Sequence, residues 1–187
     1  DLASQCSDVL IISGLAYGID VCAHRAAIKY GLPTIGVLAH GLDRIYPSVH
    51  RNTAAQMVDC GGLLTEYVSH TEPERTNFLQ RNRIVAGMAD ATIIVESAAK
   101  GGSLVTASIA NSYGRDCFTF PGRITDLSSV GCHRLIRNNQ AALITSANDF
   151  IEAMIWDTAQ KSQAIQQSLF PELNEEESRV VQVLEKY

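Results

Sequence analysis

The stretch from Val9 to His24, VLIISGLAYGIDVCAH, constrains the fold of this chain most strongly. Its apolar run ends at Ser13-Gly14, a second glycine follows at Gly18, and a helix-compatible segment begins at Asp20. This order predicts a strand, a glycine-rich turn and a helix. Such a unit presents backbone N–H groups and a helix N-terminus to an anion, so the turn is a candidate phosphate site.

Strand-like and helix-like segments alternate along the rest of the chain. The apolar runs are continuous rather than alternating, as expected for parallel strands that are covered on both faces. We predict strands at Val9–Ser13, Thr34–Ala39, Leu63–Glu66, Ala91–Glu96, Asp116–Phe120 and Ala142–Ile144. We predict helices at Asp20–Tyr30, Val49–Asp59, Arg81–Met88, Ser103–Tyr113 and Gly131–Asn139. The repetition indicates an α/β fold with a doubly wound, mostly parallel, Rossmann-like sheet, whose ligands bind beyond the carboxyl ends of the strands.

The two ends of the chain differ from its centre. Residues 1–7 resemble the end of a helix, so we expect one earlier β-α unit to be missing from the first domain. Beyond Trp156 the sequence becomes polar and rich in glutamine, which is typical of a linker. Asn174 then begins a capping pattern that is followed by apolar residues at helical spacing. We therefore expect a domain at 1–157, a linker at 158–173, and the first helix of a truncated C-terminal helical domain at 174–187.

Composition and charge narrow the possible classes of protein. No apolar run approaches the length of a membrane span, and no signal peptide is recognisable. The five cysteines include no C-x-x-C pair, which disfavours a zinc site or a disulfide framework and favours the reduced cytoplasm. The net charge is −5, yet between residues 75 and 137 eight arginines and lysines outnumber four acidic residues. This segment predicts a local surface that attracts anions.

Two common nucleotide-binding motifs are absent. A dinucleotide site would need G-x-G-x-x-G and an acidic residue after the next strand, whereas the chain has Gly14-Leu-Ala-Tyr-Gly18 and then His40-Gly41. A P-loop would need its lysine after the glycines, whereas Lys100 precedes them. We therefore expect no bound cofactor and no ATP hydrolysis.

Glycine, serine and basic residues follow several predicted strands. A single glycine at such a place commonly does no more than permit a tight turn between strand and helix. Several of them at one edge of a parallel sheet predict a phosphate-binding cleft, because the helix that follows adds free N–H groups. The candidates are Ser13, Gly14, Lys100, Gly101, Gly102, Ser103 and Arg123.

The segment RTNFLQRNR, residues 75–83, gathers three arginines, an amide and an aromatic ring. Arginine is well suited to bidentate phosphate contacts, and Phe78 could stack on a base. Core packing is an equally good explanation for Phe78. On a helix, Arg81 and Arg83 would point to nearly opposite sides, so one of them is available to pair with a structural carboxylate such as Glu96.

Several motifs together resemble those of one family. The segments SGLAYGIDVCAH, GLDRIYP, LLTEY, FLQRNRIVAG, GSLVTA and FPGR, spread between about Val9 and Ile144, are similar to those of the DNA-processing protein A family, DprA or Smf. This resemblance implies an extended Rossmann domain that binds single-stranded DNA and loads the RecA recombinase during natural transformation. It also implies a homodimer. The residues that it implies in the DNA pocket are Arg75, Phe78, Arg81, Asn82 and Arg83.

The chain departs from the family pattern in places. His133 stands where the family usually has asparagine, and Gln140-Ala141 replaces glycine-alanine before the last strand. The earlier strand of the family, with a G-[ST]-R motif that supplies a further pocket arginine, is absent from this sequence. The segment that begins near Asn174 would match the winged-helix-like domain that often follows.

Two classes of function remain open from the sequence. The first is a non-catalytic, metal-free binder of single-stranded DNA, with phosphates on Arg75, Arg81, Lys100 and the backbone of Gly14 and Gly102. The second is a nucleotide-processing enzyme similar to nucleoside monophosphate N-glycosidases. Those enzymes use a glutamate in a P-G-G-x-G-T-x-x-E loop, and this chain lacks it; Glu66 and Glu96 are its only carboxylates at strand ends. We expect His24 to be a structural hydrogen-bonding residue, and we favour the binder.

Overall fold

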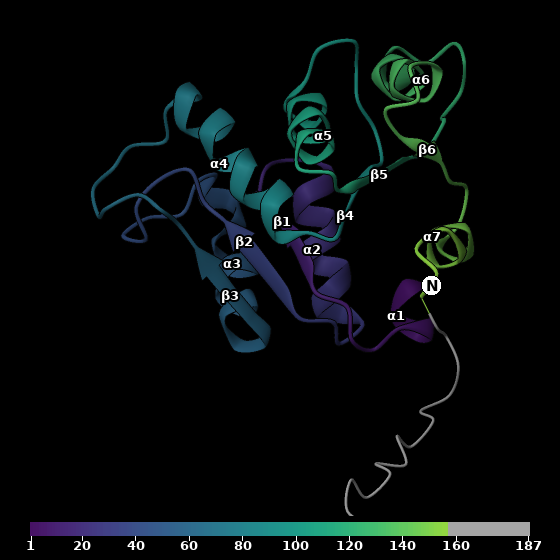
Figure 1. The fold of residues 1–187 in the computed structure, drawn as a ribbon. Coiled ribbons are helices and arrows are strands. Elements are labelled where there is room, and N and C mark those ends of the chain that lie inside the picture. Colours follow the sequence, from purple (N-terminus) through teal and green to yellow (C-terminus); the bar gives the residue numbers. More distant parts are fainter. Residues whose placement is uncertain (157–187) are drawn as a thin grey trace, which may run out of the picture. The chain divides into compact units, whose positions relative to one another are not determined.

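Six parallel strands build the core of this structure, a computed structural model that describes residues 1–156 (Figure 1). The first sheet has the order β1-β2-β3 and the second the order β4-β5-β6. Their bounds are β1 (Ile11–Ser13), β2 (Thr34–Val37), β3 (Gly61–Leu64), β4 (Ala91–Ile94), β5 (Asp116–Thr119) and β6 (Ala142–Leu143). The expected linker and C-terminal helix lie outside the described residues.

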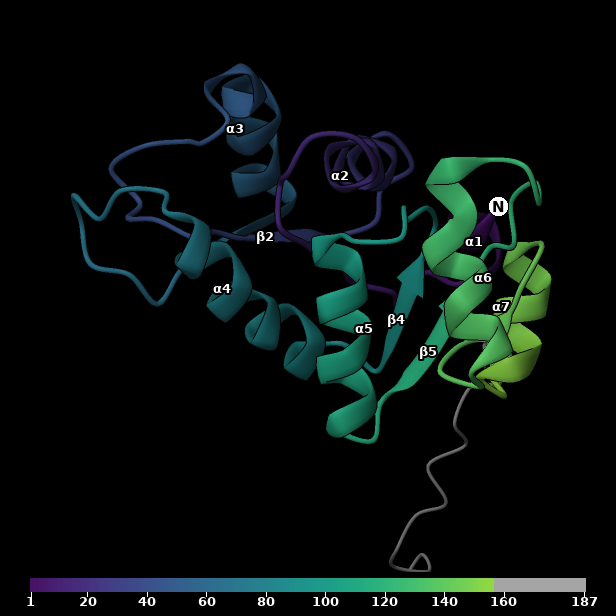
Figure 2. The same ribbon diagram turned by 90° about the horizontal axis from the view of Figure 1, so that it is seen from above.

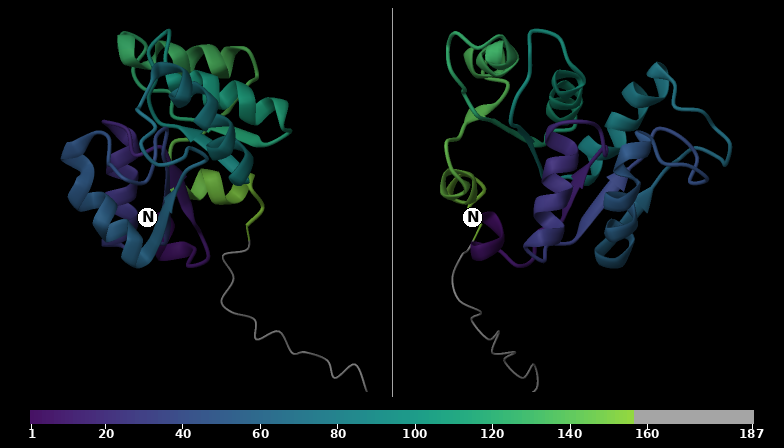
Figure 3. Two further views of the ribbon diagram at one scale, coloured as in Figure 1. Left: turned by 90° about the vertical axis from the view of Figure 1, so that its left-hand side faces the viewer. Right: turned by 180° about the vertical axis from the view of Figure 1, so that it is seen from behind.

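Helices connect the strands and cover the sheets. They are α1 (Leu2–Gln5), α2 (Ile19–Lys29), α3 (Arg51–Cys60), α4 (Arg75–Met88), α5 (Gly102–Ser112), α6 (Val130–Arg137) and α7 (Ala147–Ala153), with short 3₁₀ turns at Ser48–His50 and Leu127–Ser129. Figure 2 shows α2 and α3 on one side of β2 and α4 on the other, with α5 beside α4. Figure 3 gives the same arrangement from the side and from behind. The parallel α/β arrangement confirms the predicted fold class, and its strands pair as two three-stranded ladders.

Three clusters of apolar side chains hold these layers together. Leu15, Leu38, Ala54 and Met57 pack between the first sheet and its helices. A second cluster fills the space under β4 and β5 and includes Ala86 of α4 and Cys117 of β5. The third joins Phe118 to Phe150 and Ile151 of α7.

The expectation that Cys117 is a small core residue is confirmed, since its side chain is buried. Within residues 1–156, no helix is long and apolar enough to cross a membrane.

Several predicted boundaries differ from the structure; most strands are shorter than predicted, and two elements begin more than one residue earlier. Helix α4 begins at Arg75 and not at Arg81, because its first two turns are mostly exposed and therefore carry no apolar stripe from which a helix could be read. Strand β3 begins at Gly61 instead of Leu63, because its ladder with β2 pairs Thr34 with Gly61. Helix α7 was not predicted; the Oγ of Ser146 caps it by accepting a hydrogen bond from the N–H of Asp149.

Candidate nucleic-acid interface

The turn between β1 and α2 binds a carboxylate from its own chain. The N–H groups of Gly14 and Ala16 both donate to Oδ2 of Asp20, at 3.0 and 3.3 Å. Asp20 therefore occupies the place that a bound anion would take in a glycine-rich turn. Because the Gly14 N–H is already paired, the expectation that it holds a phosphate is not supported. Ser13 lies half-buried at the end of β1.

Arg81 is buried, with 4% of its surface exposed. Its Nη1 donates to the carbonyl oxygens of Gly14, at 2.9 Å, and of Val37. These bonds attach α4 to the carboxyl ends of β1 and β2. Burial lowers the pKa of the guanidinium, and the Asp20 carboxylate counteracts that effect. The expectation that Arg81 lies on the DNA-facing surface is not supported, because the structure places its guanidinium inside the protein.

Arg83 points to the other side of α4. It is exposed and forms an ion pair with Glu66, the residue that follows Thr65 beyond β3. The expected divergence of Arg81 and Arg83 on the helix is thus confirmed. The carboxylate that pairs with one of them is Glu66, and not Glu96 as suggested from the sequence.

The RNR segment meets the glycine-rich turn that precedes α5. Nδ2 of Asn82 lies 3.5 Å from the carbonyl oxygen of Gly102, the first residue of α5. The Ser103 hydroxyl donates to that of Ser97, at 3.0 Å, which fixes the turn from inside. Within residues 1–156, no side chain caps the N-terminus of α5. Two motifs that are 20 positions apart in the sequence therefore share one surface.

Besides Arg83, three basic residues of the predicted set are exposed: Arg75, Lys100 and Arg123. Arg75 begins α4, Lys100 precedes α5, and Arg123 follows β5. Because β4 and β5 are parallel neighbours, Lys100 and Arg123 both follow strand ends at the same edge of the second sheet. None of the three forms an ion pair with a carboxylate of residues 1–156. Their charges are therefore available to an external anion.

Phe78 is half-buried and packs against a ring that the sequence analysis missed. The centroids of Phe78 and Tyr46 lie 5.9 Å apart, and the two rings are inclined by 51°. The guanidinium carbon of Arg81 lies 5.9 Å from the centroid of Phe78. Tyr46 is 47% exposed. The only indication of Tyr46 in the sequence was its position in GLDRIYP, one of the segments that resemble the family.

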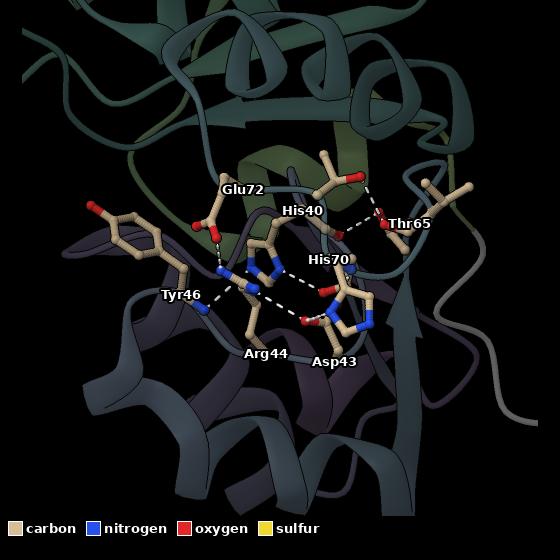
Figure 4. Close-up of polar contacts among 10 residues, drawn as sticks. His40, Asp43, Arg44, Tyr46, Thr65, His70 and Glu72 are labelled. Atoms are coloured by element: carbon tan, nitrogen blue, oxygen red, sulfur yellow. Dashed lines mark hydrogen bonds and ion pairs between the residues drawn. The ribbon is translucent and has the colours of Figure 1, made fainter.

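The loop that carries Tyr46, residues 40–47, is anchored by a buried histidine. The Tyr46 N–H donates to Nε2 of His40, at 3.2 Å, while Nδ1 of His40 donates to the carbonyl oxygen of Gly41, at 2.9 Å. The hydroxyl of Thr65 donates to the His40 carbonyl oxygen, at 2.8 Å. Figure 4 shows this network, with His40 between Tyr46 and Thr65.

Charged residues then join loop 40–47 to loop 65–74. Oδ1 of Asp43 accepts the N–H of His70, at 2.7 Å, and this bond lowers the pKa of the Asp43 carboxyl. Arg44 pairs with Asp43, at 3.2 Å, and with Glu72, at 2.5 Å (Figure 4). The Gly41 N–H donates to the carbonyl oxygen of Thr71, at 3.2 Å. The two loops are therefore held as one unit beside the start of α4.

His24 of α2 is buried and acts as a hydrogen-bond donor toward β2. The Thr34 hydroxyl donates to the carbonyl oxygen of Ile11, at 2.9 Å, so it accepts from Nδ1–H of His24, at 2.7 Å. Burial lowers the pKa of His24 to about 4. This pairing supports a structural role for the histidine.

Among residues 1–156 there is no group of three or more His, Cys, Asp or Glu side chains that could hold a metal ion.

The family follows from a comparison over almost the whole described region. The family model for DNA recombination-mediator protein A matches residues 2–155. This chain belongs to that family. It is 40% identical to DNA processing protein DprA of Streptococcus pneumoniae over 145 residues, 78% of this chain and 51% of that protein. It is 41% identical to protein Smf of Escherichia coli over 145 residues, 77% of this chain and 38% of that protein. The chain thus spans between about a third and a half of the length of these curated relatives.

Two solved structures of family members share the fold. The X-ray structure of DprA from Streptococcus pneumoniae aligns with a TM-score of 0.74 and 39% identity, over 81% of this chain and 53% of that one. DNA processing protein A from Helicobacter pylori aligns with a TM-score of 0.73 and 30% identity, over 82% and 68%. That second structure is described in terms of its single-stranded DNA binding mode.

In this member of the DNA recombination-mediator protein A family, all predicted site residues except the half-buried Ser13 fall into two groups. Those at the surface can meet a ligand, whereas the buried ones and the paired backbone shape the site from within. The surface group comprises Arg75, Phe78, Asn82, Arg83, Lys100, Gly101, Gly102, Ser103 and Arg123. The inner group comprises Arg81 and the Gly14 backbone, to which the structure adds Asp20.

Proposed function

We propose that this chain binds single-stranded DNA at the carboxyl ends of its strands and catalyses no reaction on it. The observation that carries the proposal is on α4. Arg75, exposed and without an ion-pair partner among residues 1–156, lies one helical turn before Phe78, which packs on Tyr46. A cation beside aromatic rings suits a strand whose phosphates and bases are both accessible. Family membership and the single-stranded DNA binding of the Helicobacter pylori relative support the same reading.

In this proposal the surface residues share the contacts with the strand. Arg75, Lys100 and Arg123 neutralise phosphates, and the N–H groups at the start of α5 add donors. Arg83 can join them only when it leaves Glu66, so its contribution is smaller. Arg81 acts from inside, because its bonds to the carbonyls of β1 and β2 set the position of α4.

A finer proposal concerns the fate of the bound strand. We propose that the protein acts in the cytoplasm as a homodimer and passes single-stranded DNA to the RecA recombinase during natural transformation. Its support is the family description, a DNA recombination mediator, together with the motif resemblance.

The alternative, a nucleoside monophosphate N-glycosidase, gains no support from the side chains that it would need. Glu66 forms an ion pair with Arg83, so its carboxylate is already engaged by a cation of the protein. His24 is buried and bonded to Thr34. Glu96 is exposed. We therefore propose a single function, the binding of DNA.

The test is a titration of labelled oligo-dT at several salt concentrations. We expect the logarithm of the binding constant to fall linearly with the logarithm of the salt concentration, because neutralised phosphates release counterions. Arg75→Ala should weaken binding and reduce the slope by about 0.7, the loss of one phosphate contact on a single strand. Arg115→Ala is the matched control, since this exposed arginine precedes β5 at the opposite edge of the sheet.

Two results would overturn the proposal. One is an absence of oligo-dT binding even at low salt. The other is release of the base from a mononucleotide that disappears in Glu96→Ala, since this outcome would favour the enzyme.

A further inference from the structure

Of the paired rings Tyr46 and Phe78, the more exposed one is Tyr46, and not the phenylalanine that the family motif points to. Phe78 is half-buried, and the Arg81 guanidinium and the Tyr46 ring both approach it. Tyr46 is 47% exposed, and its hydroxyl bonds to no other group of residues 1–156. Since the rings are in contact, with centroids 5.9 Å apart, no base fits between them. A base can therefore stack only on the outer side of the pair.

We propose that Tyr46 is a base-stacking residue of this protein and that Phe78 supports it from behind. The ligand is a nucleobase of single-stranded DNA, so the inference rests on the proposed function above. Tyrosine suits this role, because its ring offers a π-face that every base can stack on whatever the sequence. The inclined contact with Phe78 is a favourable aromatic geometry, so it holds the Tyr46 ring in position.

The loop beneath Tyr46 is organised before any ligand arrives. Its backbone N–H is bonded to the buried His40, and loop 40–47 is joined to loop 65–74 through Asp43 and Arg44 (Figure 4). A residue that is already ordered loses little further freedom on binding, which strengthens binding. The network thus fixes the backbone that carries the exposed ring.

Charge next to the ring pair favours a nucleic acid over another apolar ligand. Arg75 lies three positions before Phe78 on α4 and is exposed. Arg75 therefore lies close to Phe78, the residue that supports the Tyr46 ring. When a base stacks on Tyr46, Arg75 can bind a phosphate of the same strand.

The experiment compares two strands of equal length: oligo-dT and a strand in which abasic sites replace the central nucleotides. Tyr46→Leu should weaken the binding of oligo-dT by about tenfold, because one stacked base is lost, and leave the abasic strand within about twofold of wild type. Tyr46→Phe should bind both strands like wild type, since the hydroxyl is not used. Tyr113→Leu is the matched control, because this tyrosine is 51% exposed and follows the far end of α5.

A second variant keeps the proposal testable if Tyr46→Leu does not fold. Tyr46→Trp should bind oligo-dT, and the indole fluorescence that it adds to that of the native Trp156 should be quenched by oligo-dT but not by the abasic strand. Equal losses on both strands in Tyr46→Leu, or no loss on oligo-dT, would refute the stacking role while the proposed function stands. Failure of the wild-type chain to bind either strand would refute the proposed function itself.

Discussion

The guanidinium of Arg81 lies directly against the backbone of Gly14. Its Nη1 donates to the Gly14 carbonyl oxygen, at 2.9 Å, and a Cβ on residue 14 would overlap the guanidinium. A side chain at position 14 would therefore displace the arginine. Glycine is therefore required here by the packing of a buried cation and not by the approach of a phosphate.

The first prediction is that Gly14→Ala destabilises the protein by about 1–3 kcal/mol, as overpacking of a buried site commonly does. The measurement is the free energy of unfolding from urea denaturation. Gly62→Ala is the matched control, because a Cβ there meets no atom within 4 Å. The control should be neutral or slightly stabilising. Equal effects of the two variants would contradict the packing argument.

The second prediction separates the two arginines of the RNR segment. Arg81→Ala removes the donor to the buried carbonyl oxygen of Val37 and to the partly buried one of Gly14, so we expect the free energy of unfolding to fall by roughly 2–4 kcal/mol. Arg83→Ala removes only a surface ion pair and should cost less than about 1 kcal/mol. Urea denaturation of both variants checks the contrast. A fully stable Arg81→Ala would show that the guanidinium does not hold α4.

The third prediction concerns the pH dependence of stability. Burial lowers the pKa of His24 from 6.5 to about 4, an effect that Asp20 opposes and that Arg81 and His50 increase. Between pH 6.5 and 4 the unfolded chain therefore binds a proton that the folded chain does not. As the pH falls from 6.5 to 4, the protonation of His24 in the unfolded chain should lower the free energy of unfolding by about 3 kcal/mol. Above pH 6.5, His24 should not affect the pH dependence of this free energy.

His24→Leu provides the comparison, because it cannot titrate. The difference in free energy of unfolding between wild type and His24→Leu should shift by about 3 kcal/mol toward the variant as the pH falls from 7 to 4. A constant difference over this range would show that His24 is protonated equally in both states.

The fourth prediction concerns the joined loops. Asp43→Ala removes the acceptor for the His70 N–H and one partner of Arg44, so loop 65–74 should open more often. Limited proteolysis should then cut this loop faster than in wild type. Asp59→Ala, which removes an exposed carboxylate of α3, should leave the rate unchanged. Since the pKa of Asp43 is lowered in the folded state, its stabilising effect is present above the ordinary carboxyl pKa and is lost as the pH falls through the lowered one.

The fold class and the position of most elements could be predicted from the residues alone. Continuous apolar runs such as Thr34–Ala39 identify buried parallel strands, because both faces of such a strand are covered. Glycine-containing turns after these runs mark the edge of the sheet where ligands bind. The polar first turns of α4 could not be predicted in this way, since an exposed helix start carries no apolar period.

Which candidates face a ligand depends on contacts that form only in the folded protein. Arg81 and Arg83 are chemically identical in the sequence, but the first reaches Gly14, 67 positions away, and the second reaches Glu66. The N–H of Gly14 is bound by Asp20, and Phe78 is joined by Tyr46 from a distant loop. The physical reason is that burial and pairing depend on neighbours brought together by folding, whereas residue type and spacing report only what a side chain is able to do.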